Sequence, residues 1–209
     1  MKINVQPEFQ TDSLEYEQLK NAIAETKDVE GATCEIGLRA GGGTMHMLDS
    51  LIETEQYHTK SHITVDPYGN IDYVHNDDTV WKVDYTNRMR DDCLMNIYVY
   101  QVLTECKVDF HFFNLEDTEF FKRYADGVPV YNEVKKFITK YSVVHLDGPH
   151  SVAALLPEIE FFHPRMDKGA KIIFDDTELY SHEKIHEYML SIGWERTVLG
   201  ERKQTYTKL

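Results

Sequence analysis

Three aspartates stand directly after two apolar segments of the 209-residue chain. Asp147 ends the segment Y-S-V-V-H-L-D, and Asp175 and Asp176 end the segment A-K-I-I-F-D-D. If these segments are neighbouring parallel strands, their carboxyl ends lie about 5 Å apart. Bare carboxylates at that distance repel and raise one another's pKa, and a hard divalent cation such as Mg²⁺ relieves the repulsion. The spacing therefore predicts a metal site at these three residues, with helix capping or hydrogen bonding to loop amides as the alternative.

A glycine-rich turn is the second feature that could support chemistry. Residues 35–44 read E-I-G-L-R-A-G-G-G-T, between an apolar stretch and an amphipathic one. Glycines there allow positive φ and a close approach of ligand to backbone, and the following helix offers free N–H groups. The turn lacks the G-K-[ST] of a Walker A loop and does not match G-x-G-x-x-G. A ligand other than a typical P-loop phosphate or dinucleotide is therefore expected.

The elements that must position these residues alternate between strand and helix. Strands are expected at residues 33–37, 61–66, 108–114, 141–147 and 170–176, and helices at 13–27, 44–55, 91–106, 116–124, 131–140, 151–162 and 181–192. Two last strands, 194–199 and 204–208, are separated by a hairpin-length turn. The pattern predicts an α/β fold, a Rossmann-like, doubly wound, mostly parallel seven-stranded sheet with a C-terminal antiparallel hairpin.

We expect an N-terminal helical extension at residues 1–30 and one domain at 31–209, with an insertion at about 67–90. The span from Pro67 to Arg88 is polar and longer than an ordinary βα loop. It predicts a lid whose Tyr73, Trp81 and Tyr85 stack on a ring and whose aspartates bind hydroxyls, or else a solvated loop.

The composition narrows the kinds of partner that are expected for this protein. The formal net charge is −14 with 42% hydrophobic residues, which disfavours a nucleic-acid partner and fits a soluble globular protein. The chain has no signal-peptide pattern and no apolar stretch of membrane-spanning length, so a cytoplasmic protein without membrane contact is expected. Its three scattered cysteines fit neither zinc nor disulfides.

At residues 35–44 the sequence resembles class I S-adenosylmethionine-dependent methyltransferases. More narrowly, it is similar to the group of macrocin O-methyltransferase and related sugar O-methyltransferases, in which an E-x-G-x-x-x-G-G turn follows the first strand. The resemblance covers roughly Gly31 to Leu209 and includes the final hairpin. It implies a cofactor site for S-adenosylmethionine.

The resemblance assigns roles to particular residues. Glu35 would lie under the methionine ammonium, and Asp66 in V-D-P-Y-G would accept hydrogen bonds from the ribose hydroxyls. Glu116 would lie near the adenine; a turn-initiating role for Asp66 and helix capping by Glu116 are the alternatives. The implied cofactor set is Glu35, Gly37, Gly41, Gly43, Asp66, Glu116 and Asp147.

The same resemblance implies Mg²⁺ at Asp147, Asp175 and Asp176, and metal-assisted O-methylation of a small-molecule hydroxyl of the sugar or secondary-metabolite type. One position departs from the group: some members carry another Asp two residues after the fourth-strand Asp, where this chain has Pro149 followed by His150. The general base is expected to be His150 or Asp147, with capping of the following helix as the alternative role of His150.

Two other functions remain open from the sequence. A nicotinamide-dependent oxidoreductase would also use Asp66 and a glycine turn. A non-catalytic cofactor-binding homologue would keep the fold without turnover. A homo-oligomer is possible in either case.

Overall fold

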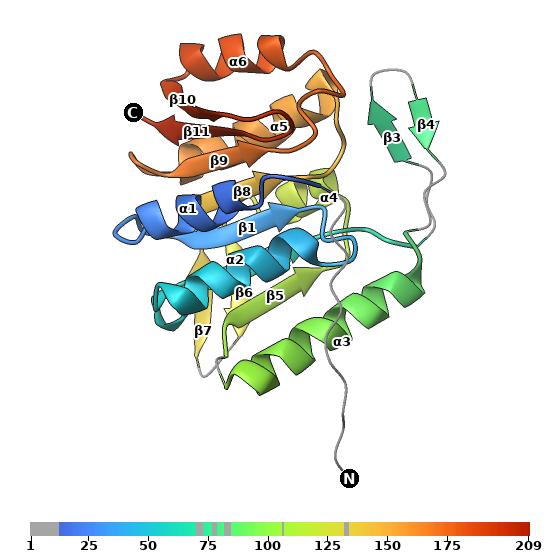
Figure 1. Ribbon diagram of the computed structural model, residues 1–209, viewed down its shortest axis with the longest axis vertical. Helices are drawn as coiled ribbons and strands as arrows, with labels where there is room; N and C mark the ends of the chain where they lie inside the picture. The colour runs from blue at the N-terminus through green and yellow to red at the C-terminus, as the bar shows by residue number, and fades with distance from the viewer. Residues whose placement is uncertain (1–12, 70–72, 77–78, 82–84, 106, 132–133) are drawn as a thin grey trace.

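The computed structural model describes residues 13–69, 73–76, 79–81, 85–105, 107–131 and 134–209. Within these ranges a seven-stranded sheet has the order β10-β11-β9-β8-β1-β2-β5, with helices on both faces (Figure 1). The predicted Rossmann-like fold is confirmed.

The parallel part of the sheet contains the strands whose ends form the candidate site. These are β1 (Ala32–Ile36), β2 (Ser61–Val65), β5 (Asp109–Phe113), β8 (Tyr141–Leu146) and β9 (Lys171–Phe174). The closing hairpin consists of β10 (Trp194–Leu199) and β11 (Gln204–Lys208), and β11 pairs antiparallel with both β10 and β9. The turn of this hairpin, residues 200–203, therefore lies at the edge where the parallel strands end.

Two groups of helices bury the two faces. Helices α1 (Glu17–Glu25), α2 (Gly42–Glu53) and α3 (Asn87–Thr104) share one apolar cluster with strand residues such as Val143 and Ile173. Helices α4 (Asp117–Arg123), α5 (Val152–Phe162) and α6 (His182–Ser191) share another with Val144 and Phe174. Adjacent strand residues serve opposite clusters because side chains alternate across a strand. Two short 3₁₀ helices, η1 (Gln56–His58) and η2 (His163–Arg165), complete the connections.

The helix predicted at residues 131–140 is wrong. The chain forms an antiparallel hairpin there, with β6 (Val128–Tyr131) and β7 (Lys135–Ile138). Val128 and Val130 are buried while Pro129 and Tyr131 are more exposed, which is the period of two expected for a strand. The expected helix began at the last residue of β6, so most of this alternation lay in a stretch for which no element was predicted. Valine, tyrosine and phenylalanine favour the strand as well.

The predicted insertion contains a second small hairpin, in which β3 (Tyr73–Asn76) pairs with β4 (Thr79–Trp81). In Figure 1 it lies on the side toward which the parallel strands point. Residues 70–72, 77–78 and 82–84 and the side chains of 70–84 lie outside the described residues. The lid role expected for Tyr73, Trp81 and the aspartates of this span therefore remains a prediction.

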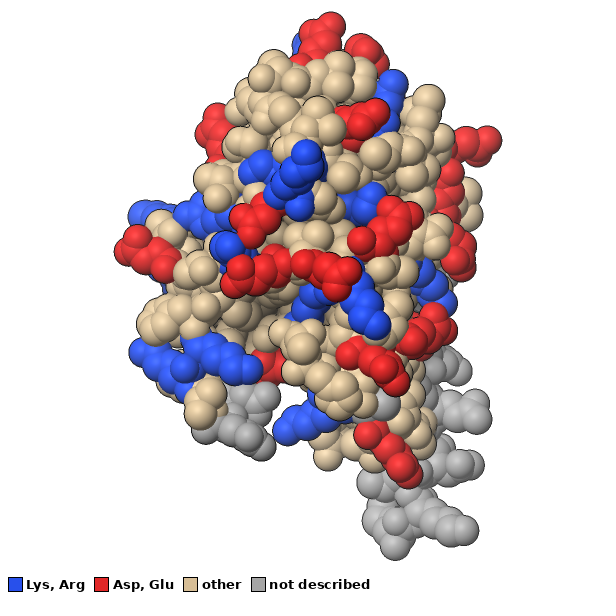
Figure 2. Space-filling model, turned by 90° about the vertical axis from the view of Figure 1, so that its left-hand side faces the viewer, with Lys and Arg blue, Asp and Glu red and all other residues tan. Residues whose placement is uncertain are grey.

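The opposite side of the molecule, where the parallel strands begin, faces the viewer in Figure 2, and its Lys and Arg side chains lie among Asp and Glu. Lys140 is an example: its Nζ lies 2.8 Å from a carboxylate oxygen of both Glu30 and Asp167. No helix in the described ranges combines the length and apolar character needed to cross a membrane.

Packing of α5 against the sheet gives a first prediction. Ile159 is fully buried in the core, whereas Leu190 on α6 is half exposed. Ile159→Ala is expected to lower the free energy of unfolding by about 2–5 kcal/mol because it leaves a cavity. Leu190→Ala, also on a helix, should change it by roughly 0.5 kcal/mol or less. Urea unfolding followed by circular dichroism measures both, and equal losses would contradict this assignment of the core.

Candidate active site

The predicted site residues line up along the edge where the parallel strands end. From β9 through β8, β1 and β2 to β5, the residues that follow the strands are Asp175 and Asp176, then Asp147, Gly37, Asp66 and Glu116. With a strand spacing of about 4.8 Å, β8 and β2 lie roughly 10 Å apart. Ligands of open α/β sheets bind at this edge, next to the point where strand order reverses.

The glycine turn connects β1 to α2 as predicted. Gly37 has a φ of 93° and Gly41, the N-cap of α2, a φ of 87°, both in the left-handed region that favours glycine. A Cβ on Gly37 would overlap the backbone carbonyl of Asp147, and one on Gly43 would overlap Oε1 of Glu35. The turn therefore needs glycine both for its backbone conformation and for the close approach of two neighbouring groups.

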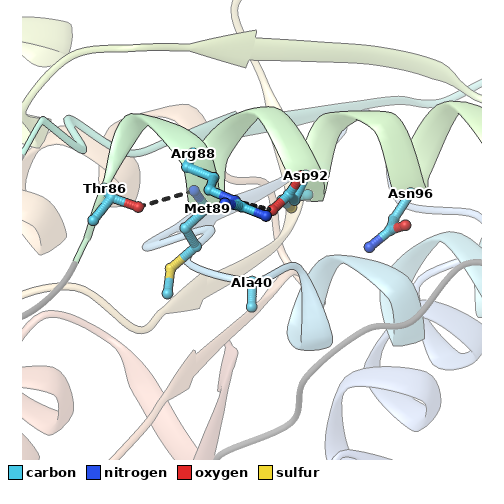
Figure 3. A pocket seen from close by; sticks show the side chains of 7 residues that line it. Ala40, Thr86, Arg88, Met89, Asp92 and Asn96 are labelled. Carbon is cyan, nitrogen blue, oxygen red and sulfur yellow. Dashed lines mark hydrogen bonds and ion pairs between the residues drawn. The ribbon is translucent and has the colours of Figure 1, made fainter.

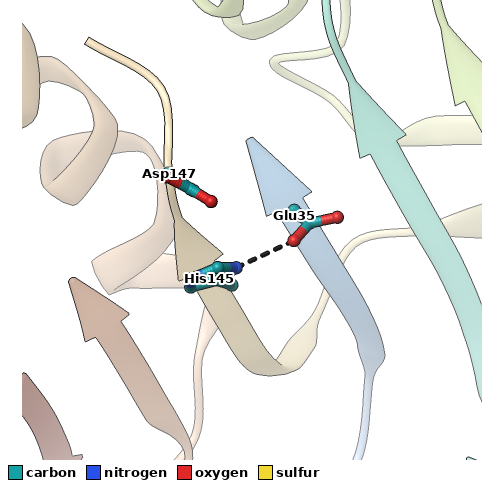
Figure 4. A group of neighbouring side chains, drawn as sticks. All are labelled: Glu35, His145 and Asp147. Carbon is teal, nitrogen blue, oxygen red and sulfur yellow. Dashed lines mark hydrogen bonds and ion pairs between the residues drawn. The ribbon is translucent and has the colours of Figure 1, made fainter. Parts of the chain in front are cut away.

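Glu35 is the start of a buried row of charges. It lies on β1 with 1% of its surface exposed and accepts a hydrogen bond from the Thr44 hydroxyl. Its Oε1 lies 2.8 Å from Nδ1 of His145 on the neighbouring strand β8, as Figure 4 shows. Nε2 of His145 lies 3.6 Å from Oδ2 of Asp175. Burial alone would lower the pKa of His145, but Asp175 and Glu35 raise it, so a positive imidazolium between two carboxylates is favoured.

Two cations from the β10–β11 turn complete the row. Nζ of Lys203, a fully buried residue, lies 2.5 Å from Oδ2 of Asp175. Arg202 forms an ion pair with Asp176, and its Nε lies 2.8 Å from Oε1 of Glu178. Burial would raise the pKa of Asp175, but His145 and Lys203 hold it well below its usual range.

Asp147 differs from its neighbours. Its side chain is 24% exposed, against 0% for Asp175. The closest cationic partner in the described residues is Nε2 of His150, at 3.9 Å from Oδ1. Burial and the nearby Asp175 raise the pKa of Asp147 well above its usual range. Asp147 is therefore a partly exposed carboxyl group whose neutral form is favoured more than that of an ordinary aspartate.

The predicted metal trio is not free to bind a cation as it lies, because Asp175 is paired with Lys203 and Asp176 with Arg202. The ligand atoms that do converge belong to Glu35, His145 and Asp147, which lie within 4.8 Å of one another. Two of these three already bind each other in the buried row. The residues present thus do not fit a hydrated divalent ion, which needs several unengaged oxygens.

Asp66 is held in place by backbone amides. It follows β2, and its two oxygens accept from the backbone N–H groups of Arg39 at 2.8 Å and Tyr68 at 3.0 Å. Burial raises its pKa to about 6, although these amide hydrogen bonds oppose the shift. The backbone N–H of Leu38 also lowers this pKa, and because a carboxylate has about four acceptor sites, acceptor capacity remains for a ligand.

The remaining predicted site residues are Glu116, which follows β5, and His150, which follows β8. Glu116 is exposed at the N-cap position of α4 and makes no side-chain cap hydrogen bond. His150 is buried, with Nε2 3.3 Å from Oδ2 of Asp176 and its ring 6.3 Å from that of Tyr180. The expected roles of both in binding or catalysis remain predictions.

A cavity of about 240 Å³ opens beside the glycine turn. Figure 3 shows that Ala40 faces the first turns of α3, which contribute Met89, Asp92 and Asn96. Thr86 caps that helix by accepting from the N–H of Met89 at 3.0 Å. The cavity places open space next to the turn that was predicted to admit a ligand.

Three residues of the charge row were missed in the sequence, namely His145, Arg202 and Lys203. His145 stands two residues before Asp147 on the same strand, so it could have been read as a neighbour of Glu35 across β1 and β8. The two cations required the register of the final hairpin, which places residue 204 opposite residue 174.

Sequence comparison identifies the family. A methyltransferase-domain family model matches residues 34–177, well over half of the chain, and the chain belongs to this family. A comparison with curated proteins found no match.

Solved structures support the same fold. The O-methyltransferase NovP aligns with a TM-score of 0.65 at 15% identity, covering 92% of this chain and 78% of that one. CalS11, a calicheamicin methyltransferase, aligns with a TM-score of 0.67 at 12% identity, covering 92% and 77%. An O-methyltransferase from Bacillus cereus in complex with SAH aligns at 0.58 with 10% identity, covering 96% and 84%. At these identities the likeness establishes a shared fold.

The glycine turn gives a second prediction. Gly37 and Gly193 both have left-handed φ, at 93° and 87°, but a Cβ on Gly193 would meet nothing within 4 Å. Gly193→Ala is expected to cost about 1–2 kcal/mol of unfolding free energy from backbone strain alone. Gly37→Ala should cost roughly 2 kcal/mol more, because its Cβ meets the Asp147 carbonyl. Equal losses in denaturant unfolding would show that the close approach has no energetic weight.

Proposed function

We propose that this protein is an S-adenosylmethionine-dependent O-methyltransferase that acts on a small-molecule hydroxyl. The observation that carries the proposal is the edge where Asp66, the glycine turn and Asp147 follow three adjacent strands, β2, β1 and β8. It lies within the span matched by the methyltransferase-domain family. CalS11 is described as a TDP-rhamnose 3'-O-methyltransferase, and we propose an acceptor of the same chemical class, a sugar or a secondary-metabolite hydroxyl.

The residues present fit the cofactor. Asp66 keeps acceptor capacity beyond its backbone hydrogen bonds, to which the ribose hydroxyls would donate. Gly37 and Gly41 keep the strand-to-helix turn free of side chains where the cofactor backbone would pass, and Glu116 stands on the far side of Asp66 for the adenine. The buried Glu35 contributes negative charge beneath the methionine ammonium. When bound, S-adenosylmethionine supplies a methyl group on a positively charged sulfur.

The chain must orient an acceptor hydroxyl and remove its proton. Asp147 has the accessible carboxylate with a raised pKa, so we assign it as the general base. His150 is almost fully buried beside Asp176, and we assign it the role of orienting the side chains around it. Alignment of oxygen with the methyl carbon and sulfur is then chiefly a matter of positioning. The proposed reaction uses no metal, because Asp175 and Asp176 already have cationic partners.

The other possible functions have less support. A nicotinamide oxidoreductase would use the same edge, but the antiparallel β11 between β9 and β10 and the glycine spacing favour methyl transfer. A lid role for the insertion at about 67–90 remains part of the proposal.

Cofactor binding gives the third prediction. Because Asp66 has a pKa of about 6, it is ionised above that pH and then accepts ribose hydroxyls best. Affinity for S-adenosylhomocysteine is expected to rise about tenfold from pH 5 to pH 7 and then to level off. Asp66→Asn should bind about tenfold or more weakly at pH 7, with little pH dependence in this range.

Isothermal titration calorimetry at several pH values measures this affinity. Asp126→Asn, an exposed position away from the strand ends, is the matched control and should behave as the wild type. Wild-type affinity in Asp66→Asn would remove Asp66 from the cofactor site, and no binding by either protein would overturn the proposed function.

Methyl transfer gives the fourth prediction. With a panel of sugar and phenolic acceptors and radiolabelled methyl donor, the wild type should turn over. Asp147→Asn should lower kcat by about 10²–10⁴-fold because the base is lost. His150→Gln should retain more activity than Asp147→Asn. The reverse order would transfer the role of base to His150.

A further inference from the structure

Lys203 is held from several sides at the acidic edge. Its Nζ donates to Ser13 Oγ at 2.5 Å and lies 2.5 Å from Asp175 Oδ2. Ser13 Oγ in turn donates to Asp175 Oδ1 at 2.8 Å, and the Tyr16 ring centroid lies 4.7 Å from the ammonium. A buried ammonium with a carboxylate, a hydroxyl and an aromatic face around it is a fixed charge rather than a solvated side chain.

The turn that carries Lys203 is itself clamped. The Glu15 carboxylate accepts from the backbone N–H groups of Glu201 at 3.1 Å and of Arg202 and Lys203 at 2.9 Å. Gln18 Nε2 donates to the Lys203 carbonyl at 3.0 Å. Burial would raise the pKa of Glu15, but the backbone amides and Lys203 lower it. The segment 13–18 therefore fixes the position of the ammonium through both side chain and backbone.

Sheet register places the same two residues together. Gln204 pairs with Phe174 in the antiparallel ladder of β11 and β9. Lys203 and Asp175 are the next residues beyond that pair, one on each strand, so their side chains leave the sheet on the same face.

Both oxygens of Asp175 are already engaged. Oδ1 accepts from Ser13 Oγ at 2.8 Å and from the N–H of Asp176 at 2.7 Å. Oδ2 accepts from Lys203 Nζ at 2.5 Å and faces His145 Nε2 at 3.6 Å. Three hydrogen bonds thus use three of the roughly four acceptor sites of the carboxylate, and the fourth faces the imidazole. A divalent ion would have to displace the ammonium before Asp175 could bind it.

We propose that Lys203 is the resident cation of the acidic edge and takes the place of a divalent metal at Asp147, Asp175 and Asp176. The ammonium neutralises Asp175, and Arg202 neutralises Asp176, without any exchangeable ion. The consequence for catalysis, methyl transfer that does not need metal, rests on the proposed function. The charge role of Lys203 does not depend on it and is tested by metal binding alone.

Mn²⁺ binding, followed by electron paramagnetic resonance at neutral pH, is the decisive measurement. Wild type is expected to bind no Mn²⁺ at this edge, and its melting temperature should be the same in EDTA and in Mg²⁺. Lys203→Met removes the charge at similar length and should gain one Mn²⁺ site, at least tenfold tighter than any wild-type binding. Combining it with Asp175→Asn should abolish that site.

Two variants control the experiment. Lys140→Met removes another lysine that bridges two carboxylates, far from the site at the opposite edge of the sheet, and should gain no Mn²⁺. Lys203→Arg keeps the positive charge and should also gain none.

A wild-type Mn²⁺ site that Asp175→Asn removes would overturn the proposal. The proposal would also be overturned if Lys203→Met folds, as verified by circular dichroism, but gains no Mn²⁺ site. If Lys203→Met does not fold, the comparison of Mn²⁺ binding by the wild type and by Asp175→Asn still tests the proposal. Methyl transfer absent both in EDTA and with added Mg²⁺ would refute the proposed function and leave the assignment of Lys203 intact.

Discussion

A row of alternating charges, buried from the first strand to the last hairpin, is the interaction on which this edge of the protein depends. Glu35, His145, Asp175 and Lys203 are all essentially inaccessible, and each lies within 3.6 Å of the next. In a medium of low dielectric an unpaired charge is far more costly than in water, so loss of one member leaves its neighbour uncompensated. The row links four strands of the sheet more specifically than apolar packing does.

The row also explains local sequence choices that would otherwise look unrelated. Gly43 has no side chain because Glu35 Oε1 occupies the place of its Cβ, and Thr44 supplies the hydroxyl that satisfies the same carboxylate. Glu15 satisfies the amides of the distant turn 201–203. The residues at the start of α2 are thus suited to the buried charge of Glu35. The segment around Glu15 is likewise suited to the turn that carries Arg202 and Lys203.

The sequence predicted the alternation of strands and helices, the final hairpin and the strand ends that carry Asp66, Asp147 and Asp175, because these depend on local periodicity. It did not predict the partners of Asp175, because Lys203 reaches it only through the antiparallel register of β11 against β9. The helix predicted at 131–140 failed for a local reason, since the buried Val128 and Val130 both lie before its first residue. Non-local pairing and short alternating strands were thus the two features that could not be predicted from the sequence.

Internal neutralisation leaves one carboxylate with a distinct task. Asp175 and Asp176 form ion pairs with Lys203 and Arg202, whereas the nearest cationic group to Asp147 among the described residues is His150, at 3.9 Å. In the proposed reaction the positively charged sulfur becomes neutral when the methyl group leaves. A divalent ion at these carboxylates would repel that sulfonium before transfer. The proposed ammonium behind Asp175 balances the acidic edge without such an ion, and the raised pKa of Asp147 suits the uptake of the acceptor proton.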